Sequence, residues 1–161
     1  MIRFWQKRFT NPIQLDDELE EKRAQLKKLV KKKFGGSLAI RMVDSGSCNA
    51  CEAECNALSN PYYNLEELGI HFVASPRHAD VMLLSGVGTL NMYHHSLDCF
   101  EQIPSPKWVI AIGDCTKDFG IFEKTYALKG HKKLKIDFFI KGCPPSPSEI
   151  LEGFLEFCEK A

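Results

Sequence analysis

The chain has no run of about 18 apolar residues, so it predicts no transmembrane helix and leaves only peripheral contact with a membrane. It also has no excess of either charge, because 21 basic residues balance 21 acidic ones among 161 residues. A neutral chain is a poor non-specific ligand for nucleic acid, and we expect no nucleic-acid partner. Internal repeats and low-complexity segments are missing too, and a chain of this length is expected to bury one core.

No signal-like apolar stretch precedes the cysteines, and their number, seven, is odd. Both features argue against a secreted disulfide framework and favour reduced thiols in the cytoplasm. Four of the cysteines share a setting, because each lies where an apolar, strand-like run gives way to glycine or proline. These four are Cys48, Cys51, Cys115 and Cys143. Their common setting indicates a shared metal site.

Residues 1–36 differ in pattern from the rest of the chain. They open with a basic, aromatic stretch, and residues 14–33 are predicted to form a helix with an acidic first half and a basic second half. The helix dipole favours that order of charge, which is typical of a solvated helix; a partner or a membrane surface is the alternative. We therefore expect an N-terminal helical extension at 1–36 and a folded domain at 37–161.

From residue 37 the pattern predicts an α/β domain. Short continuous apolar runs that end in Gly, Ser or Pro are typical of buried strands, and they occupy residues 38–43, 70–74, 81–84, 109–112 and 136–140. Helical patterns lie between or after them, at residues 51–58, 89–102 and 147–159. This alternation predicts a parallel sheet with helices on both faces.

The order of the strands makes the cysteine positions informative. Cys48 follows the first predicted strand, Cys115 the fourth and Cys143 the fifth, so their loops open at the carboxyl edge of the sheet, where ligands bind in such folds. Four thiolates can hold zinc or an iron–sulfur cluster. One local pair joined by two distant cysteines favours the cluster, since structural zinc sites usually use two local pairs. A zinc-stabilised interaction module remains the competing interpretation.

The other three cysteines are predicted to lie outside the site. Cys99 and Cys158 fall within amphipathic helical stretches and are expected to be small core residues. Cys55 lies one helical turn after Cys51, but its flanks lack the Gly or Pro that marks the four candidate ligands.

Four ordered motifs carry a resemblance to a known family. They are DSGSCNACEAE at 44–54, GIHFVASPRHAD at 69–80, PKWVIAIGDC at 106–115 and GCPPSP at 142–147. The chain resembles the small subunit of membrane-bound, energy-converting [NiFe] hydrogenases, which is similar to the 20 kDa, B-type subunit of NADH–quinone oxidoreductase.

The resemblance implies a flavodoxin-like domain with one [4Fe-4S] cluster, ligated by Cys48, Cys51, Cys115 and Cys143. It implies a non-catalytic electron relay docked on a large subunit that holds nickel and iron in hydrogenases or helps form the quinone pocket in quinone reductases. Seven cysteines limit the chain to one such cluster, so we expect a ferredoxin-like partner subunit. Membrane subunits of the complex would hold the chain at the inner face of the cell membrane.

The first cysteine motif distinguishes the two branches of the family. Quinone reductases carry adjacent cysteines there, whereas Asn49 and Ala50 separate Cys48 from Cys51, as in hydrogenases. We therefore favour a hydrogenase-type complex, with a B-type subunit that helps form a quinone site as the alternative.

The chain departs from the family at two positions: Ala50 and Phe119 replace glycines that the family usually has beside the cluster.

Three further features are candidates for a chemical role. Glu54 resembles a family carboxylate near the large subunit and is a candidate for proton transfer; the alternative is a helix-terminal charge. His78, by resemblance, lies near the subunit interface. The loop Gly86-Val-Gly88 opens a predicted helix and offers a weak phosphate-binding pattern, on an edge that we expect the cluster to occupy.

Overall fold

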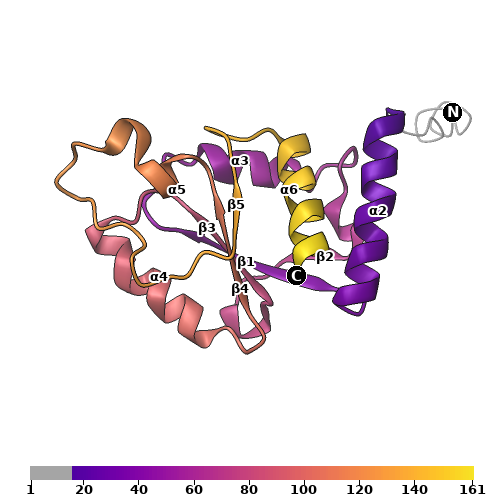
Figure 1. The fold of residues 1–161 in the computed structure, drawn as a ribbon, viewed down its shortest axis with the longest axis horizontal. Coiled ribbons are helices and arrows are strands. Elements are labelled where there is room, and N and C mark those ends of the chain that lie inside the picture. Colours follow the sequence, from indigo (N-terminus) through magenta and orange to yellow (C-terminus); the bar gives the residue numbers. More distant parts are fainter. Residues whose placement is uncertain (1–15) are drawn as a thin grey trace, which may run out of the picture.

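The computed structural model describes residues 16–161, which form a parallel sheet with helices on both sides (Figure 1). Its five strands lie in the order β2-β1-β3-β4-β5, and each neighbouring pair is parallel. This is the strand order of a flavodoxin-like fold, so the predicted fold class is confirmed. The strands are β1 (Leu38–Asp44), β2 (Ile70–Phe72), β3 (Val81–Ser85), β4 (Trp108–Ile112) and β5 (Phe138–Ile140).

Helices precede, connect and follow the strands, and α2, α4 and α6 each begin at a residue whose side chain accepts from an N–H group of the first turn. The longer ones are α2 (Asp17–Lys33), α3 (Ala50–Ala57), α4 (Leu90–Gln102) and α6 (Pro147–Lys160), and α5 (Cys115–Asp118) is a single turn. Three 3-10 turns complete the set: η1 (Leu65–Leu68), η2 (Pro76–His78) and η3 (Gly120–Phe122). Ser146 and Glu149 form a reciprocal capping box at the start of α6, which fixes where that helix begins.

Two apolar clusters cover the two faces of the sheet. Val81 and Leu83 of the central strand β3 pack into one cluster with α2, α3 and α6, while Met82 and Leu84 pack into the other beside α4. All residues of β3 are buried, because helices lie on both sides of it. Burial on both faces explains why the strands are continuous apolar runs rather than alternating ones.

Two strands are shorter than predicted. β2 ends at Phe72 rather than at residue 74: the Val73 N–H still donates to the Ile40 carbonyl (2.9 Å), and then the chain turns away into η2. β5 begins at Phe138 rather than at residue 136, because the Asp137 side chain accepts from the Val109 N–H (2.9 Å) and takes the place of a strand partner. The helices agree with the predictions to within one residue, apart from α2.

The N-terminal helix α2 begins at Asp17, and residues 14 and 15 of the predicted helix lie outside the described residues. Asp16 caps it by accepting from the Leu19 N–H (2.8 Å). Leu26 and Val30 are fully buried in the first apolar cluster, where α2 packs beside α6. The domain itself therefore covers the apolar face of α2, and the boundary proposed at residue 36 stays a prediction.

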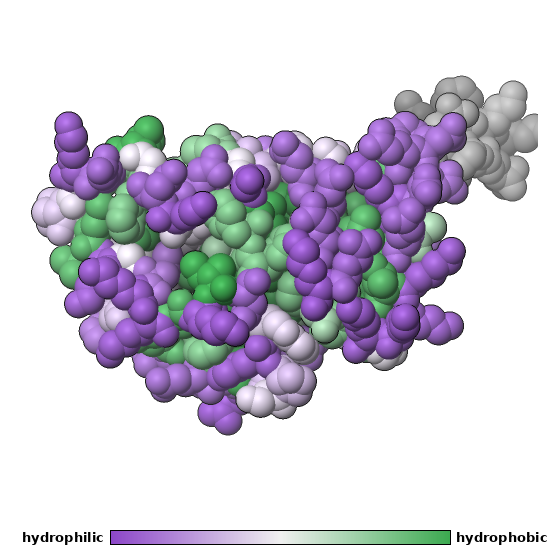
Figure 2. Space-filling model, in the orientation of Figure 1, coloured by the Kyte–Doolittle hydropathy of each residue, from purple (hydrophilic) through white to green (hydrophobic). Residues whose placement is uncertain are grey.

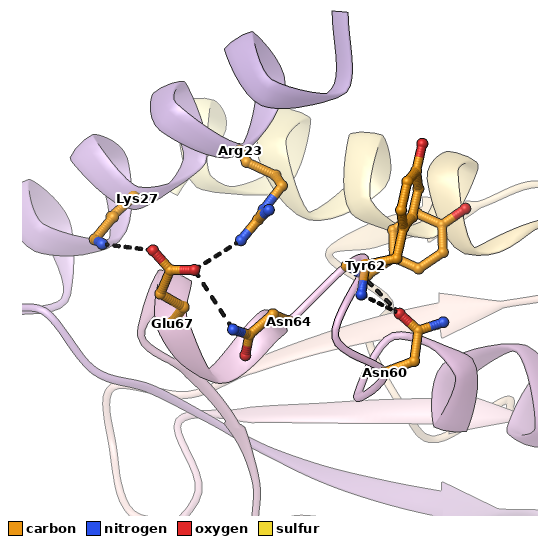
Figure 3. A network of polar contacts seen from close by, with 7 residues as sticks. Arg23, Lys27, Asn60, Tyr62, Asn64 and Glu67 are labelled. Carbon is orange, nitrogen blue, oxygen red and sulfur yellow. Dashed lines mark hydrogen bonds and ion pairs between the residues drawn. The ribbon is translucent and has the colours of Figure 1, made fainter. Parts of the chain in front are cut away.

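Polar contacts also hold α2 to the turn before β2 (Figure 3). Arg23 and Lys27 both reach the carboxylate of Glu67 in η1, at 2.9 Å and 3.4 Å. The Arg23 side chain is 11% exposed and that of Lys27 is 54% exposed, so the arginine pair is the better shielded from solvent. Among residues 16–161, no helix is long and apolar enough to cross a membrane.

Candidate metal centre

The first cysteine pair is positioned by a tight turn after β1. The Asp44 carboxylate accepts from the N–H groups of Gly46 and Ser47, at 2.7 Å each, and directs the chain back towards the sheet. Cys48 is exposed on the resulting loop, and Cys51 lies in the first turn of α3, where it is only 6% exposed. The pair thus spans the boundary between the surface and the core.

The loops that carry the other two cysteines are tied to one another. Asp114 donates its N–H to the Gly142 carbonyl (2.9 Å), and its carboxylate accepts from the Gly142 N–H (3.0 Å). Cys115 follows Asp114 as the first residue of α5 and is buried, while Cys143 follows Gly142 and is exposed. These paired bonds hold Cys115 and Cys143 in a fixed relation at the end of β4 and β5.

Gly113 leaves room for the thiols. Its φ of +91° favours glycine, and a Cβ at this position would lie 2.8 Å from Cys51 Sγ and 3.8 Å from Cys115 Sγ. A contact of 2.8 Å is too short for carbon and sulfur, so a side chain here would displace the Cys51 thiol. The β4 loop therefore brings Cys51 and Cys115 from distant parts of the sequence to the same glycine.

The two buried thiols, Cys51 and Cys115, lie close enough to the other cysteines for charge there to affect their pKa values. Burial raises the pKa of Cys51 to about 12, and charge on Cys115, Glu52, Cys48 and Cys143 acts in the same direction. Burial also raises the pKa of Cys115, with further contributions from Cys143 and Cys48. Thiolates that are buried close to one another need a cationic group beside them to neutralise their charge. Within residues 16–161, no three Cys, His, Asp or Glu side chains form a ready-made site for a metal ion.

A second carboxylate beside the thiols, Glu52, was missed by the sequence analysis. Its Oε1 atom accepts from the hydroxyls of Ser47 (2.7 Å) and Ser85, whereas its Oε2 atom is buried and has no hydrogen-bond partner among residues 16–161. Glu54, the predicted proton carrier, is half-buried on the same helix. The position of Glu52 directly after Cys51 was a possible signal, but only the fold brings Ser85, at the end of β3, to this carboxylate.

The remaining cysteines lie in or against the apolar clusters. Cys158 is fully buried, which confirms its prediction as a core residue, and Cys99 is half-buried against the second cluster. Cys55 is 1% exposed in the first cluster, and burial raises its pKa to about 12. A neutral thiol in these surroundings behaves as a small apolar side chain.

The glycine loop after β3 packs against its neighbours. A Cβ at Gly86 would lie 2.7 Å from the backbone of Gly46, and one at Gly88 would lie 2.8 Å from the backbone of Gly130. His131 contacts the same loop, because its Nε2 atom lies 3.0 Å from the Gly86 carbonyl. A carbonyl only accepts hydrogen bonds, so Nε2 carries the proton and donates it to this bond. These glycines thus serve loop packing, and the weak phosphate-binding pattern is replaced by contacts within the protein.

Phe119 and His78, which were named from the family resemblance, lie at the end of a helical turn each. Phe119 adopts a φ of +65° at the end of α5, a conformation that glycine reaches more easily, and its ring lies against Gly130. His78 is exposed at the end of η2, beside the buried Ala79. The Phe119 N–H donates to the Cys115 carbonyl (3.2 Å) and closes α5, but within residues 16–161 neither side chain makes a hydrogen bond to the thiols.

The strand order and the positions of the cysteines together define a flavodoxin-like domain with four cysteines at the carboxyl edge of its sheet, which form a candidate metal centre. The chain belongs to the family of the 20 kDa subunit of NADH ubiquinone oxidoreductase, whose model matches residues 48–157. That range contains all four cysteines of the site. The family resemblance in the sequence is confirmed.

Curated relatives come from both branches of the family. The chain is 38% identical over 144 residues to the probable membrane-bound hydrogenase subunit mbhJ of Pyrococcus furiosus, with 88% of this chain and 84% of that protein covered. It is 38% identical over 145 residues to formate hydrogenlyase subunit 7 of Escherichia coli, with 89% of this chain covered but only 55% of that protein. The B-type subunit of the NADH-quinone oxidoreductase of Citrifermentans bemidjiense is 37% identical over 111 residues, with 68% and 65% covered.

Solved structures show the same architecture. A chain of the membrane-bound sulfane sulfur reductase, an archaeal respiratory membrane complex, superposes with a TM-score of 0.68 at 30% identity, covering 84% of this chain and 74% of that one. A chain of an NAD+-reducing [NiFe]-hydrogenase superposes with a TM-score of 0.60 at 14% identity, covering 77% and 92%, and supports the fold alone.

Proposed function

We propose that this chain is a non-catalytic electron-transfer subunit that carries one [4Fe-4S] cluster on Cys48, Cys51, Cys115 and Cys143. The observation that carries the proposal is the space at Gly113, where thiols from the β1 and β4 loops converge and any side chain would displace Cys51. All-thiolate ligation is the donor set that iron–sulfur clusters use. When bound, the cluster would accept and donate one electron at a time.

The chain's own residues would position and insulate that group. Cys51 and Cys115 lie in the buried wall of the site, whereas Cys48 and Cys143 form its exposed rim. The buried thiols would be held as thiolates only with a cationic centre beside them, since burial alone keeps them protonated. The exposed rim leaves the site accessible to a partner subunit.

The complex that we propose is a membrane-attached oxidoreductase of hydrogenase type, with a large subunit, a ferredoxin-like subunit and membrane subunits as partners. Asn49 and Ala50 separate the first two cysteines, and the hydrogenase relatives align over more of the chain than the quinone reductase relative does. A peripheral position at the inner face of the cell membrane fits relatives whose names place them in membrane-bound complexes. Four nickel-ligating cysteines in the co-purifying large subunit would decide for hydrogenase over quinone reductase.

We also propose that Glu54 transfers protons at the boundary with the large subunit. It is half-buried three residues after Cys51, one turn further along α3. A carboxylate at a boundary between subunits can accept a proton on one side and release it on the other, which suits proton transfer.

The test is iron and acid-labile sulfide analysis of the anaerobically purified chain, together with electron paramagnetic resonance of the reduced protein. Replacement of Cys48, Cys51, Cys115 or Cys143 by Ser should abolish or remodel the signal, because a hydroxyl is a poor ligand for a soft metal site. Cys99→Ala serves as the matched control and should leave iron and sulfide unchanged. Stoichiometric zinc without sulfide would instead support the zinc-stabilised module and overturn the electron-transfer function.

A further inference from the structure

The segment 117–135, which runs from the end of α5 through η3 towards β5, exposes the least buried large hydrophobic residues of the described chain. Ile121 is 89% exposed and Tyr126 is 97% exposed, whereas the next in rank, Leu90, is 46% exposed. Leu90 belongs to the same surface, because its N–H donates to the carbonyl of Ala127, the residue after Tyr126 (2.7 Å). Aromatic and aliphatic side chains that protrude in this way are typical anchors of protein interfaces.

The segment is held in place by the core domain. The N–H groups of Lys129 and Gly130 both donate to the Gly88 carbonyl, at 2.8 Å and 2.9 Å, and Leu134 is buried in the second apolar cluster. Thr89 and Leu128 form an isolated bridge next to these bonds. Tyr126 is therefore presented from an anchored loop, so less conformational entropy is lost when a partner binds than with a free one.

The charge of the segment differs from that of the whole chain. Six lysines face only two acidic residues between positions 117 and 135, although the chain as a whole is neutral. Three of these lysines have partners: Lys117 lies over the Phe139 ring, Lys129 over the Tyr93 ring, and Lys135 pairs with Asp137 (3.1 Å). Within residues 16–161, the other three form no ion pair, and all three are exposed: Lys124, Lys132 and Lys133.

The segment adjoins the thiol site. A Cβ at Gly120, the residue before Ile121, would lie 4.0 Å from the Cβ of Cys115. In Figure 1 the segment forms the left end of the molecule, opposite α2, and Figure 2 shows hydrophobic surface interrupted by hydrophilic side chains at that end. A protein bound there would lie beside the third candidate ligand.

From these observations we infer that the segment 117–135 is a docking surface for an acidic protein subunit, with Tyr126 and Ile121 as apolar anchors and Lys124, Lys132 and Lys133 as the complementary charges. The inference rests on the proposed function in one respect, that the chain works within a complex. A protein fits this surface better than an anionic membrane, since membrane binding at an interface uses a broad apolar helix face, whereas this loop offers separated side chains among charges. Paired opposite charges would also direct the partner to this end of the sheet.

The experiment places the photo-crosslinking residue p-benzoylphenylalanine at position 126 of the full-length chain within its native complex. Irradiation should link it to a peptide in which Asp and Glu outnumber Lys and Arg. The same residue at position 72 is the control, because Phe72 is exposed on β2 at the opposite edge of the sheet and should not give that product. A product with lipid, a product with a neutral or basic peptide, or no product at position 126 would overturn the inference.

Charge reversal gives a second, independent readout. The triple variant Lys124→Glu, Lys132→Glu, Lys133→Glu should lower the yield of the acidic product at least tenfold. The matched control reverses three exposed lysines of α2 and should leave the yield near that of the wild type: Lys28→Glu, Lys31→Glu, Lys32→Glu. Equal losses in both triple variants would contradict the inference. Iron and sulfide are measured in the same preparations: cluster without crosslink rejects the docking surface alone, and crosslink without cluster rejects the proposed function alone.

Discussion

The substitution Gly113→Ala tests the assembly of the thiol site most directly. Alanine at a φ of +91° is strained, and its Cβ would meet Cys51 Sγ at 2.8 Å. The strain costs about 1–2 kcal/mol of unfolding free energy, and forcing apart a packed contact costs about 1–3 kcal/mol more. We therefore expect a loss of about 2–5 kcal/mol in the apoprotein, together with loss of more than half of the iron after anaerobic reconstitution, because a ligand has moved.

Gly36→Ala is the matched control, since Gly36 has a φ of +97° but no atom within 4 Å of its would-be Cβ. It should show the strain cost of about 1–2 kcal/mol alone, with full iron content. Urea unfolding gives the free energies, and iron and sulfide assays give the occupancy. In a Cys51→Ala background, Gly113→Ala should cost no more than Gly36→Ala, because the clashing sulfur is gone. Equal free energies and equal iron for Gly113→Ala and Gly36→Ala in the normal background would refute the reasoning.

Three further predictions concern other parts of the molecule. Arg23→Ala should lower the unfolding free energy by about 1–2 kcal/mol and Lys27→Ala by less than about 0.5 kcal/mol. The difference is expected because, of the two basic partners of Glu67, only the arginine is shielded from solvent. Equal losses in urea unfolding would contradict this. Burial lowers the pKa of His131, so protonation of this side chain favours the unfolded state. The unfolding free energy should therefore fall as the pH drops below 6.5, the ordinary pKa of histidine. His131→Gln should weaken that fall when unfolding is measured from about pH 7.5 to about pH 5.5. Glu54→Gln should slow hydrogen-dependent dye reduction by the whole complex without shifting the titrated cluster potential; near-native turnover would reject the proton role.

The sheet could be predicted from the sequence because burial on both faces leaves a simple signal. The apolar runs that became β1, β3 and β4 are continuous, and the structure places each within one or two residues of its predicted bounds. The two edge strands, β2 and β5, were predicted too long. At the edges the pattern of apolar residues continues beyond the last strand hydrogen bond, and side chains such as Asp137 decide where pairing stops.

The placement of the cysteines at one edge of the sheet followed from the strand order, but the polar contacts around them did not. Each cysteine could be assigned to a loop at the carboxyl edge, because parallel strands all end on one side. One hydroxyl that holds Glu52 belongs to Ser47, which is close in sequence, but the other belongs to Ser85 at the end of β3. A polar contact between a helix and a separate strand depends on side-chain directions that no local pattern records.

Hydrogen bonds tie the loops of the candidate site to one another and to the segment that we propose as a docking surface. Gly88 links the 129–131 segment to the loop after β1, because its N–H donates to Ser45 Oγ (3.2 Å) while its carbonyl accepts from Lys129 and Gly130. Ser45 lies three residues before Cys48. A partner that shifts the 117–135 segment therefore acts on Cys115 through α5 and on the first cysteine pair through Gly88 and Ser45. These hydrogen bonds form a contiguous path by which contact with a partner would reach the thiols, in addition to simple proximity.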